Sequence, residues 1–140
     1  MNDTALPIEQ YLSYSLAAAH RNVHQSLNAK LKEMGIQVEA WRILEVLSAE
    51  ENRTMGELAE AVLMTPSALT KLVDRMVADG LVHRQVSQVD HRRVQLVLTN
   101  LGRTQVGKLR EFAGAQNDEI REKLGAEKLE LLKEVLKTLS

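Results

Sequence analysis

The sequence has no cysteine among its 140 residues, two prolines, and only 3% aromatic residues. The absence of cysteine excludes disulfides, thiolate zinc sites, cysteine nucleophiles and thiol-based peroxide sensing. No apolar run is long enough to cross a bilayer, and the polar N-terminus lacks the pattern of a secretion signal, so we expect a cytoplasmic protein with no membrane partner. Scarce proline, together with abundant leucine, alanine, glutamate and lysine, favours a mainly helical chain.

The sequence also lacks the usual features of enzymes and metal sites. It contains no glycine-rich phosphate loop, no nucleophile paired with a base and no carboxylate dyad, so we expect neither catalysis nor a cofactor. His20 and His24 are four residues apart and share a helix face, as half of a metal site would require. Two histidines alone are more typical of a surface or an interface, so no metal is expected.

The net charge of −1 is unevenly distributed along the chain. Between Met64 and Arg110 there are eight basic and three acidic residues, a local charge of +5, so the remaining residues carry −6. A basic centre between acidic ends is typical of a surface that faces a polyanion. A solvated basic face would give the same pattern, and charge alone does not separate the two interpretations.

Hydrophobic periodicity predicts one long helix and one short helix at the start of the chain. Apolar residues recur in steps of three and four over residues 8–34, and Gly35 is the expected stop. A second helix is expected over residues 38–47. The first helix is longer than most helices of globular proteins, so part of its apolar stripe is expected to pack outside its own domain.

Two further short helices, over residues 55–62 and 66–79, are separated by a turn of only three residues. Thr65 is expected to cap the second of them, with Pro66 at its first position and Gly80 at its end. After Gly80, apolar residues alternate with polar ones on both sides of a basic segment, which predicts a β-hairpin. This order of helices and hairpin is that of a winged helix, in which the last helix before the hairpin enters the DNA major groove.

The C-terminal part of the sequence predicts two more helices, which meet at Gly125. Gly107 and Gly114 lie inside the first of them, where only close packing would account for them. The last helix carries an apolar face too broad for one small domain to cover, and the N-terminal helix of a second copy is its simplest partner. We therefore expect one domain over residues 1–140, with a DNA-binding lobe at 36–103 and dimerisation helices at 5–34 and 105–139.

Two stretches of sequence, from Ser67 to Arg84 and from Asp90 to Gly102, closely resemble the MarR family of transcriptional regulators. The most specific motifs are Asp74-Arg75, Gly80-Leu-Val-x-Arg84, and Asp90-x-Arg92 running on to Leu98-Thr99. The resemblance implies a winged helix-turn-helix that binds double-stranded DNA. It also implies that Asp90 pairs with Arg92 while an arginine at the hairpin tip enters the minor groove, which favours arginine where it narrows.

The predicted DNA-binding residues lie on the fourth helix and on the hairpin, or wing. The candidates on the helix are Thr65, Ser67, Ala68, Thr70, Lys71 and Arg75. Those on the wing are Arg84, Asp90, His91, Arg92 and Arg93. His91 stands where the family most often has arginine or lysine, so the identity of the side chain that enters the groove stays open. Arg84 either anchors the hairpin or binds phosphate.

An effector site is a further expectation from the resemblance, since the family often admits small phenolic or carboxylate compounds beside the dimer helices. The candidate residues are Tyr14, His20, Trp41 and Arg42. For Trp41, the favoured alternative is that it belongs to the core. The sequence therefore predicts a homodimeric repressor of a pseudo-palindromic operator, relieved by a small aromatic or anionic compound. The alternative function is a winged-helix module that binds protein and not specific DNA.

Overall fold

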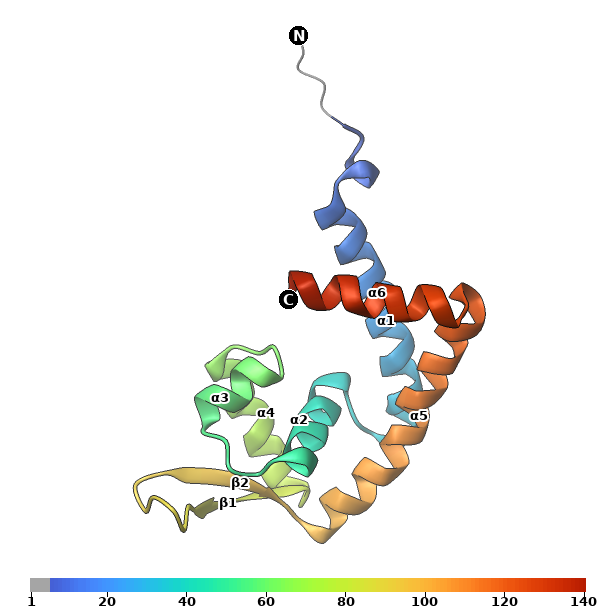
Figure 1. The fold of residues 1–140 in the computed structure, drawn as a ribbon. Coiled ribbons are helices and arrows are strands. Elements are labelled where there is room, and N and C mark those ends of the chain that lie inside the picture. The colour runs from blue at the N-terminus through green and yellow to red at the C-terminus, as the bar shows by residue number, and fades with distance from the viewer. Residues whose placement is uncertain (1–5) are drawn as a thin grey trace.

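The structure, a computed structural model, describes residues 6–140 and confirms a mainly helical fold with one β-hairpin (Figure 1). Its elements are η1 (Ile8–Gln10), α1 (Leu12–Leu31), η2 (Lys32–Met34), α2 (Val38–Ala49), α3 (Met55–Ala61), α4 (Pro66–Ala78), β1 (Val82–Val86), β2 (Val94–Leu98), α5 (Asn100–Leu124) and α6 (Ala126–Leu139). Helices α2, α3 and α4 and the hairpin form one lobe. From this lobe α5 leads to an arm that contains α1 and α6.

The predicted first helix is interrupted at both ends. Ile8–Gln10 form a separate 3-10 turn, Tyr11 is extended (φ −81°, ψ 130°), and the α-helix begins only at Leu12. No residue of η1 is buried, so no packing against residues 6–140 holds this segment in a continuous helix. At the other end the helix tightens to η2 before Gly35, which has φ 71°. The expected start of this segment at residue 5 lies outside the described residues.

The turn between α3 and α4 has the predicted local chemistry. The Thr65 hydroxyl accepts a hydrogen bond from the Ala68 amide at 3.2 Å, and Pro66 is the first residue of α4. Gly80 ends that helix with φ 77°. Within the turn Leu63 has φ 63°, a left-handed conformation that costs about 1–2 kcal/mol for a residue with a side chain. The short turn therefore fixes the direction in which α4 leaves α3.

The core of the lobe is centred on α2, whose Ile43, Leu44 and Leu47 are fully buried. Residues from the surrounding elements and from the first half of α5 pack around them: Leu58, Leu69, Val73, Leu96, Leu98, Val106 and Leu109. Trp41 is only partly buried and packs against the edge of this core. Because α4, the hairpin and α5 share one core, the candidate DNA-binding elements are held in fixed relative positions.

The hairpin is anchored at its base and exposed toward its tip. Its two strands are antiparallel, with Val82 opposite Leu98 and Val86 opposite Val94. The first pair is buried, whereas Val86 and Val94 are about half exposed, so the apolar alternation does not predict burial along the whole wing. At the base the Thr99 hydroxyl donates to the Gly80 carbonyl at 2.6 Å, which ties the end of the hairpin to the end of α4.

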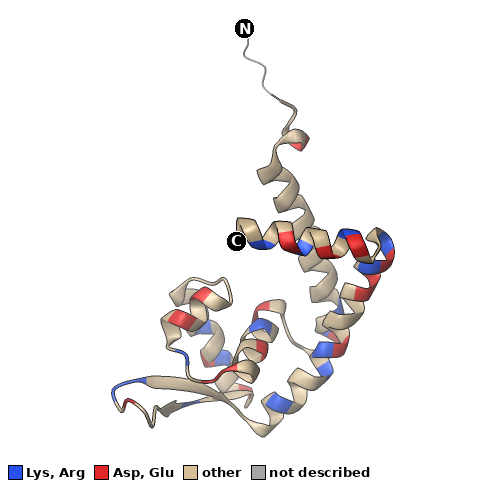
Figure 2. Ribbon diagram, viewed as in Figure 1, with Lys and Arg blue, Asp and Glu red and all other residues tan. Residues whose placement is uncertain are grey.

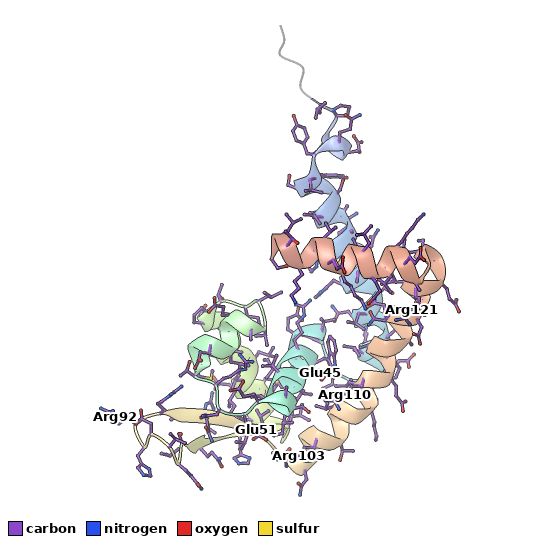
Figure 3. The ribbon with its side chains drawn as sticks, viewed as in Figure 1. Glu45, Glu51, Arg92, Arg103, Arg110 and Arg121 are labelled. Carbon is purple, nitrogen blue, oxygen red and sulfur yellow. The ribbon has the colours of Figure 1, made fainter. Side chains whose placement is uncertain are left out.

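Polar contacts join the arm to the lobe. Asn28 of α1 accepts the Val38 amide at 2.9 Å and so satisfies the first amide of α2. The Arg110 guanidinium of α5 binds both carboxylate oxygens of Glu45, with its Nε 2.9 Å from Oε1, and it also donates to the hydroxyl of Ser48 on α2 (Figure 3). The hydrogen bonds with Glu45, together with the charge of that carboxylate, raise the pKa of Arg110. Within residues 6–140 no helix combines the length and apolarity that a bilayer span needs.

Candidate nucleic-acid interface

One face of α4 is exposed to solvent and polar, as the sequence predicts. Leu69, Val73 and Met76 are buried on the opposite face. The exposed residues are Thr65, Ser67, Ala68, Thr70, Lys71, Asp74 and Arg75. The Thr70 hydroxyl donates to the Pro66 carbonyl at 3.0 Å and keeps its acceptor capacity. This face presents hydroxyl, ammonium and guanidinium groups from a helix whose backbone is fixed by the core, the arrangement that reads base edges in a major groove.

The wing tip is held by a small network around Asp90 and Ser87. The carboxylate of Asp90 accepts the Arg92 amide at 3.0 Å and lies 3.4 Å from Nε of Arg92. This is the pairing that the family resemblance implies. The buried Ser87 hydroxyl accepts the amides of Val89 and Asp90. The turn is therefore ordered by its own side chains, in a form that leaves the Arg92 side chain outside.

The two neighbouring arginines of the wing have different surroundings. The side chain of Arg92 is 92% exposed and points away from the hairpin (Figure 3). Arg93 turns back toward α3, where its guanidinium lies 3.3 Å from the Glu57 carboxylate. Arg92 is therefore the arginine that can extend farther from the protein. His91 is also exposed, beside Asp90 and Arg92.

Glu57 connects the wing to the helix-turn-helix. The sequence analysis did not predict this contact. Its carboxylate accepts the Thr54 amide at 2.9 Å, and the Thr54 hydroxyl accepts the Glu57 amide, completing a capping box for α3. The hydrogen bonds from Thr54 hold the pKa of Glu57 below its usual range, and Arg93 lowers that pKa further. The Thr-x-x-Glu spacing is a sequence signal for the cap, whereas the contact with Arg93 has no local signal.

Arg84 anchors the base of the wing. Its guanidinium forms an ion pair with Asp74, so β1 is tied to the exposed side of α4. Of the two roles that the sequence leaves open for Arg84, this contact corresponds to the anchor. Figure 2 shows further basic residues at the wing tip, beyond this pair.

The structure brings the expected effector residues only partly together. Tyr14 is 41% exposed on α1, whereas Trp41 and Arg42 are half-buried on α2. The rings of His20 and His24 lie 5.3 Å apart, and Nε2 of His24 is 3.3 Å from the carboxylate of Glu39. Glu39 is thus a neighbour that the sequence pattern did not indicate. Among the described residues no cluster of three or more potential ligands is placed to hold a metal ion.

Comparisons with known proteins place this geometry in a family. A family model described as the MarR family matches residues 34–93. The chain is 30% identical over 103 residues to the transcriptional repressor IacR of Pseudomonas putida; the match covers 74% of this chain and 62% of the length of that relative. It is 33% identical over 110 residues to the transcriptional regulator FarR of Neisseria gonorrhoeae, covering 79% of this chain and 75% of FarR.

The fold also matches solved structures. The transcriptional repressor CouR bound to a 23-mer DNA duplex superposes with a TM-score of 0.87 at 22% identity, covering 97% of this chain and 99% of CouR. CouR bound to p-coumaroyl-CoA gives a TM-score of 0.84, covering 94% of this chain and 93% of CouR. This likeness shows a shared fold. With the FarR match and the family model, it leads to one conclusion: the chain belongs to the MarR family of winged helix-turn-helix transcriptional regulators.

Proposed function

We propose that the protein is a homodimeric repressor that binds a pseudo-palindromic operator and is released from it by a small aromatic or anionic effector. The observation that carries the DNA-binding part is the exposed polar face of α4 beside a wing whose Arg92 points into solvent. Ser67, Thr70 and Lys71 lie in the N-terminal half of α4, the part of a recognition helix that reaches base edges. Arg92 is proposed to enter the neighbouring minor groove.

The dimer is proposed from apolar faces that the described chain leaves uncovered. On α6 these side chains are 38–59% exposed: Leu131, Leu132, Val135, Leu136 and Leu139. On η1, on α1 and at the residue between them they are Ile8, Tyr11, Leu12, Tyr14 and Leu16. From its start at Leu12 to His20, α1 carries no lysine, arginine, aspartate or glutamate (Figure 2). A second copy covers both faces at once, and its two-fold axis sets the two copies of α4 on half-sites about 10 base pairs apart.

The effector is proposed to bind where the arm meets α2, beside Tyr14, His20, Trp41 and Arg42. The indole N–H of Trp41 is buried and finds no acceptor among the described residues, which costs free energy unless a ligand supplies one. Arg42 makes no ion pair with any described residue, so its charge is available to an anion. The complex of CouR with p-coumaroyl-CoA supports such a ligand in this fold. Release from DNA requires unequal effector affinity for two dimer shapes.

The first experiment is to measure binding of the purified protein to fragments of its own genome at physiological salt with excess competitor DNA. Salt and competition separate specific binding from general electrostatic attraction. We expect a few fragments that carry inverted repeats to be retained. A confirmed dimer that retains none, and whose weak DNA binding has a shallow salt dependence, would contradict the proposal and favour a protein-binding module.

Arg92→Ala is expected to weaken binding to all duplexes alike, because Arg92 supplies charge to the DNA backbone and the minor groove. The slope of log K against log salt should become shallower by up to about one unit per half-site. Fluorescence anisotropy titrations at several salt concentrations measure both quantities. Lys108→Ala is the control, since Lys108 is an exposed cation on α5 outside both DNA-binding elements. Equal slopes for wild type and Arg92→Ala would contradict the assignment of the wing.

Lys71→Ala is expected to change the preference among sequences. The Lys71 ammonium is exposed on the proposed reading face, where a contact to a guanine edge is worth roughly tenfold in discrimination. Selection from a duplex library randomised at each half-site, for wild type and variant, measures the preference position by position. A uniform loss across all library members would show that Lys71 contacts only the DNA backbone.

A further inference from the structure

A pocket lies beside the proposed reading face, between the loop that joins α1 to α2 and the C-terminal half of α4. The outer part, about 350 Å³, is lined by Asn28, Lys32, Gly35, Ile36, Gln37 and Arg75. An inner recess of about 40 Å³ reaches Leu72 and Met76. That recess is small, and Ile36 is the one large apolar side chain of the outer part. The lining therefore suits a small hydrated anion better than an aromatic ring.

The charged groups around this pocket are available for binding. Lys32 and Arg75 are exposed, and neither forms an ion pair with a described residue. In contrast, Lys30, two residues before Lys32 and near the end of α1, is paired with Glu119 at 2.8 Å. Asp79 lines only the inner recess, so the outer part contains two cations and no carboxylate. The Val38 amide at the start of α2 is already bound by Asn28 and is therefore not a donor to the pocket.

The pocket lies at the end of a row of exposed residues on α4. Ser67, Lys71 and Arg75 are spaced four residues apart, so they follow one side of the helix toward the pocket. When the N-terminal half of such a helix reads base edges in a major groove, residues farther along the same side of the helix lie near the DNA backbone that borders the groove. A phosphate group of that backbone then falls beside the pocket, where the guanidinium of Arg75 offers paired donors and Lys32 a point charge.

We propose that Lys32, Gln37 and Arg75 form a phosphate clamp that binds one backbone phosphate of the operator in each half-site. This inference rests on the proposed function, and it adds a third contact region to α4 and the wing. Sequence reasoning assigned no role to Lys32 or Gln37. The clamp binds no base, so it sets the position and affinity of the protein on DNA and leaves sequence preference to α4.

The test measures operator binding by the full-length dimer over a range of salt concentrations. Loss of one phosphate contact per subunit should make the slope of log K against log salt shallower by about one unit per half-site, and lower the affinity about fivefold per half-site at 0.15 M salt. We expect this for Lys32→Ala and for Arg75→Ala, equally on operator and random duplexes. The double variant should lose less than the product of the two single effects, because both side chains serve one phosphate.

Lys30→Ala is the matched control, since it removes a cation two residues from Lys32 that does not line the pocket. It should leave the slope unchanged. If Lys32→Ala binds operator with the slope and affinity of wild type, the clamp is overturned while the proposed function stands. If the wild-type dimer itself binds no operator, the proposed function fails and the clamp fails with it. A thermal shift by benzoate that Lys32→Ala abolishes, with the salt slope unchanged, would overturn the clamp by assigning the pocket to an organic acid.

Discussion

Leu131→Asp is expected to make the protein monomeric and to lower its affinity for the full operator at least 100-fold. The Leu131 side chain is 59% exposed on α6, in the apolar face proposed to meet the second copy. In a two-fold interface one substitution places two carboxylates in the buried contact, and each loses its hydration there. The monomer keeps one reading helix, but its binding to one half-site no longer holds a second helix near the other half-site. This coupling of two half-sites raises affinity by roughly 10²–10⁴-fold.

The measurements are sedimentation equilibrium for mass and anisotropy for binding to full and half operators. Affinity for an isolated half-site should change little, since the lobe is untouched. Lys133→Asp on the opposite side of α6 is the control. The substitution introduces a carboxylate and removes an exposed ion pair with Glu130, which contributes little to stability. The Lys133→Asp variant should remain dimeric. A dimeric Leu131→Asp variant with wild-type operator affinity would contradict the proposed interface.

Local chemistry explains which parts of the fold could be predicted. The cap by Thr65, the position of Pro66 and the left-handed Gly80 depend on a few neighbouring residues, and the structure confirms all three. The hairpin followed from period-two alternation on both sides of a polar tip. The break at Tyr11 was not predicted. An apolar stripe shows that a segment can form a helix, but it does not show whether another part of the protein covers that stripe.

The contacts that organise the lobe and the candidate interface join residues distant in sequence. Glu57 and Arg93 are 36 residues apart, and Glu45 and Arg110 are 65 residues apart. A single sequence gives no signal that one acidic residue pairs with one particular distant basic residue. It therefore left open which side chain at the wing tip enters the minor groove. In the structure Arg92 and Arg93 differ in their surroundings, because Glu57 engages Arg93.

The sequence also does not show which glycine of α5 is closely packed. The sequence drew attention to Gly107 and Gly114 as sites of close packing, yet a Cβ at either meets no atom within 4 Å in the described chain. The close approach is at Gly102, where a Cβ would overlap the backbone carbonyl oxygen of Leu81. Gly102 also donates its amide to Thr99 at 3.0 Å, so it lies in the junction of α4, the hairpin and α5.

Gly102→Ala is therefore expected to lower the free energy of unfolding by about 2 kcal/mol. Alanine gains about 1 kcal/mol in helix propensity, but the overlap is with backbone, which has no rotamer to move, and forced repacking costs about 1–3 kcal/mol or more. The clash must be relieved by shifting the end of α4 or the start of α5. Operator affinity should fall with stability, because that shift displaces the wing base relative to α4.

Gly107→Ala, five residues along the same helix, is the matched variant and should have the opposite sign. With open space at the Cβ, only the propensity term remains, and the free energy of unfolding should rise by about 1 kcal/mol. Urea denaturation of both variants at one protein concentration measures the difference. If Gly102→Ala matched Gly107→Ala in stability, the junction would be looser than its hydrogen bonds indicate. If Gly107→Ala instead dissociated the dimer, the second copy would approach α5 at that glycine, and the interface would extend along α5 toward the lobe.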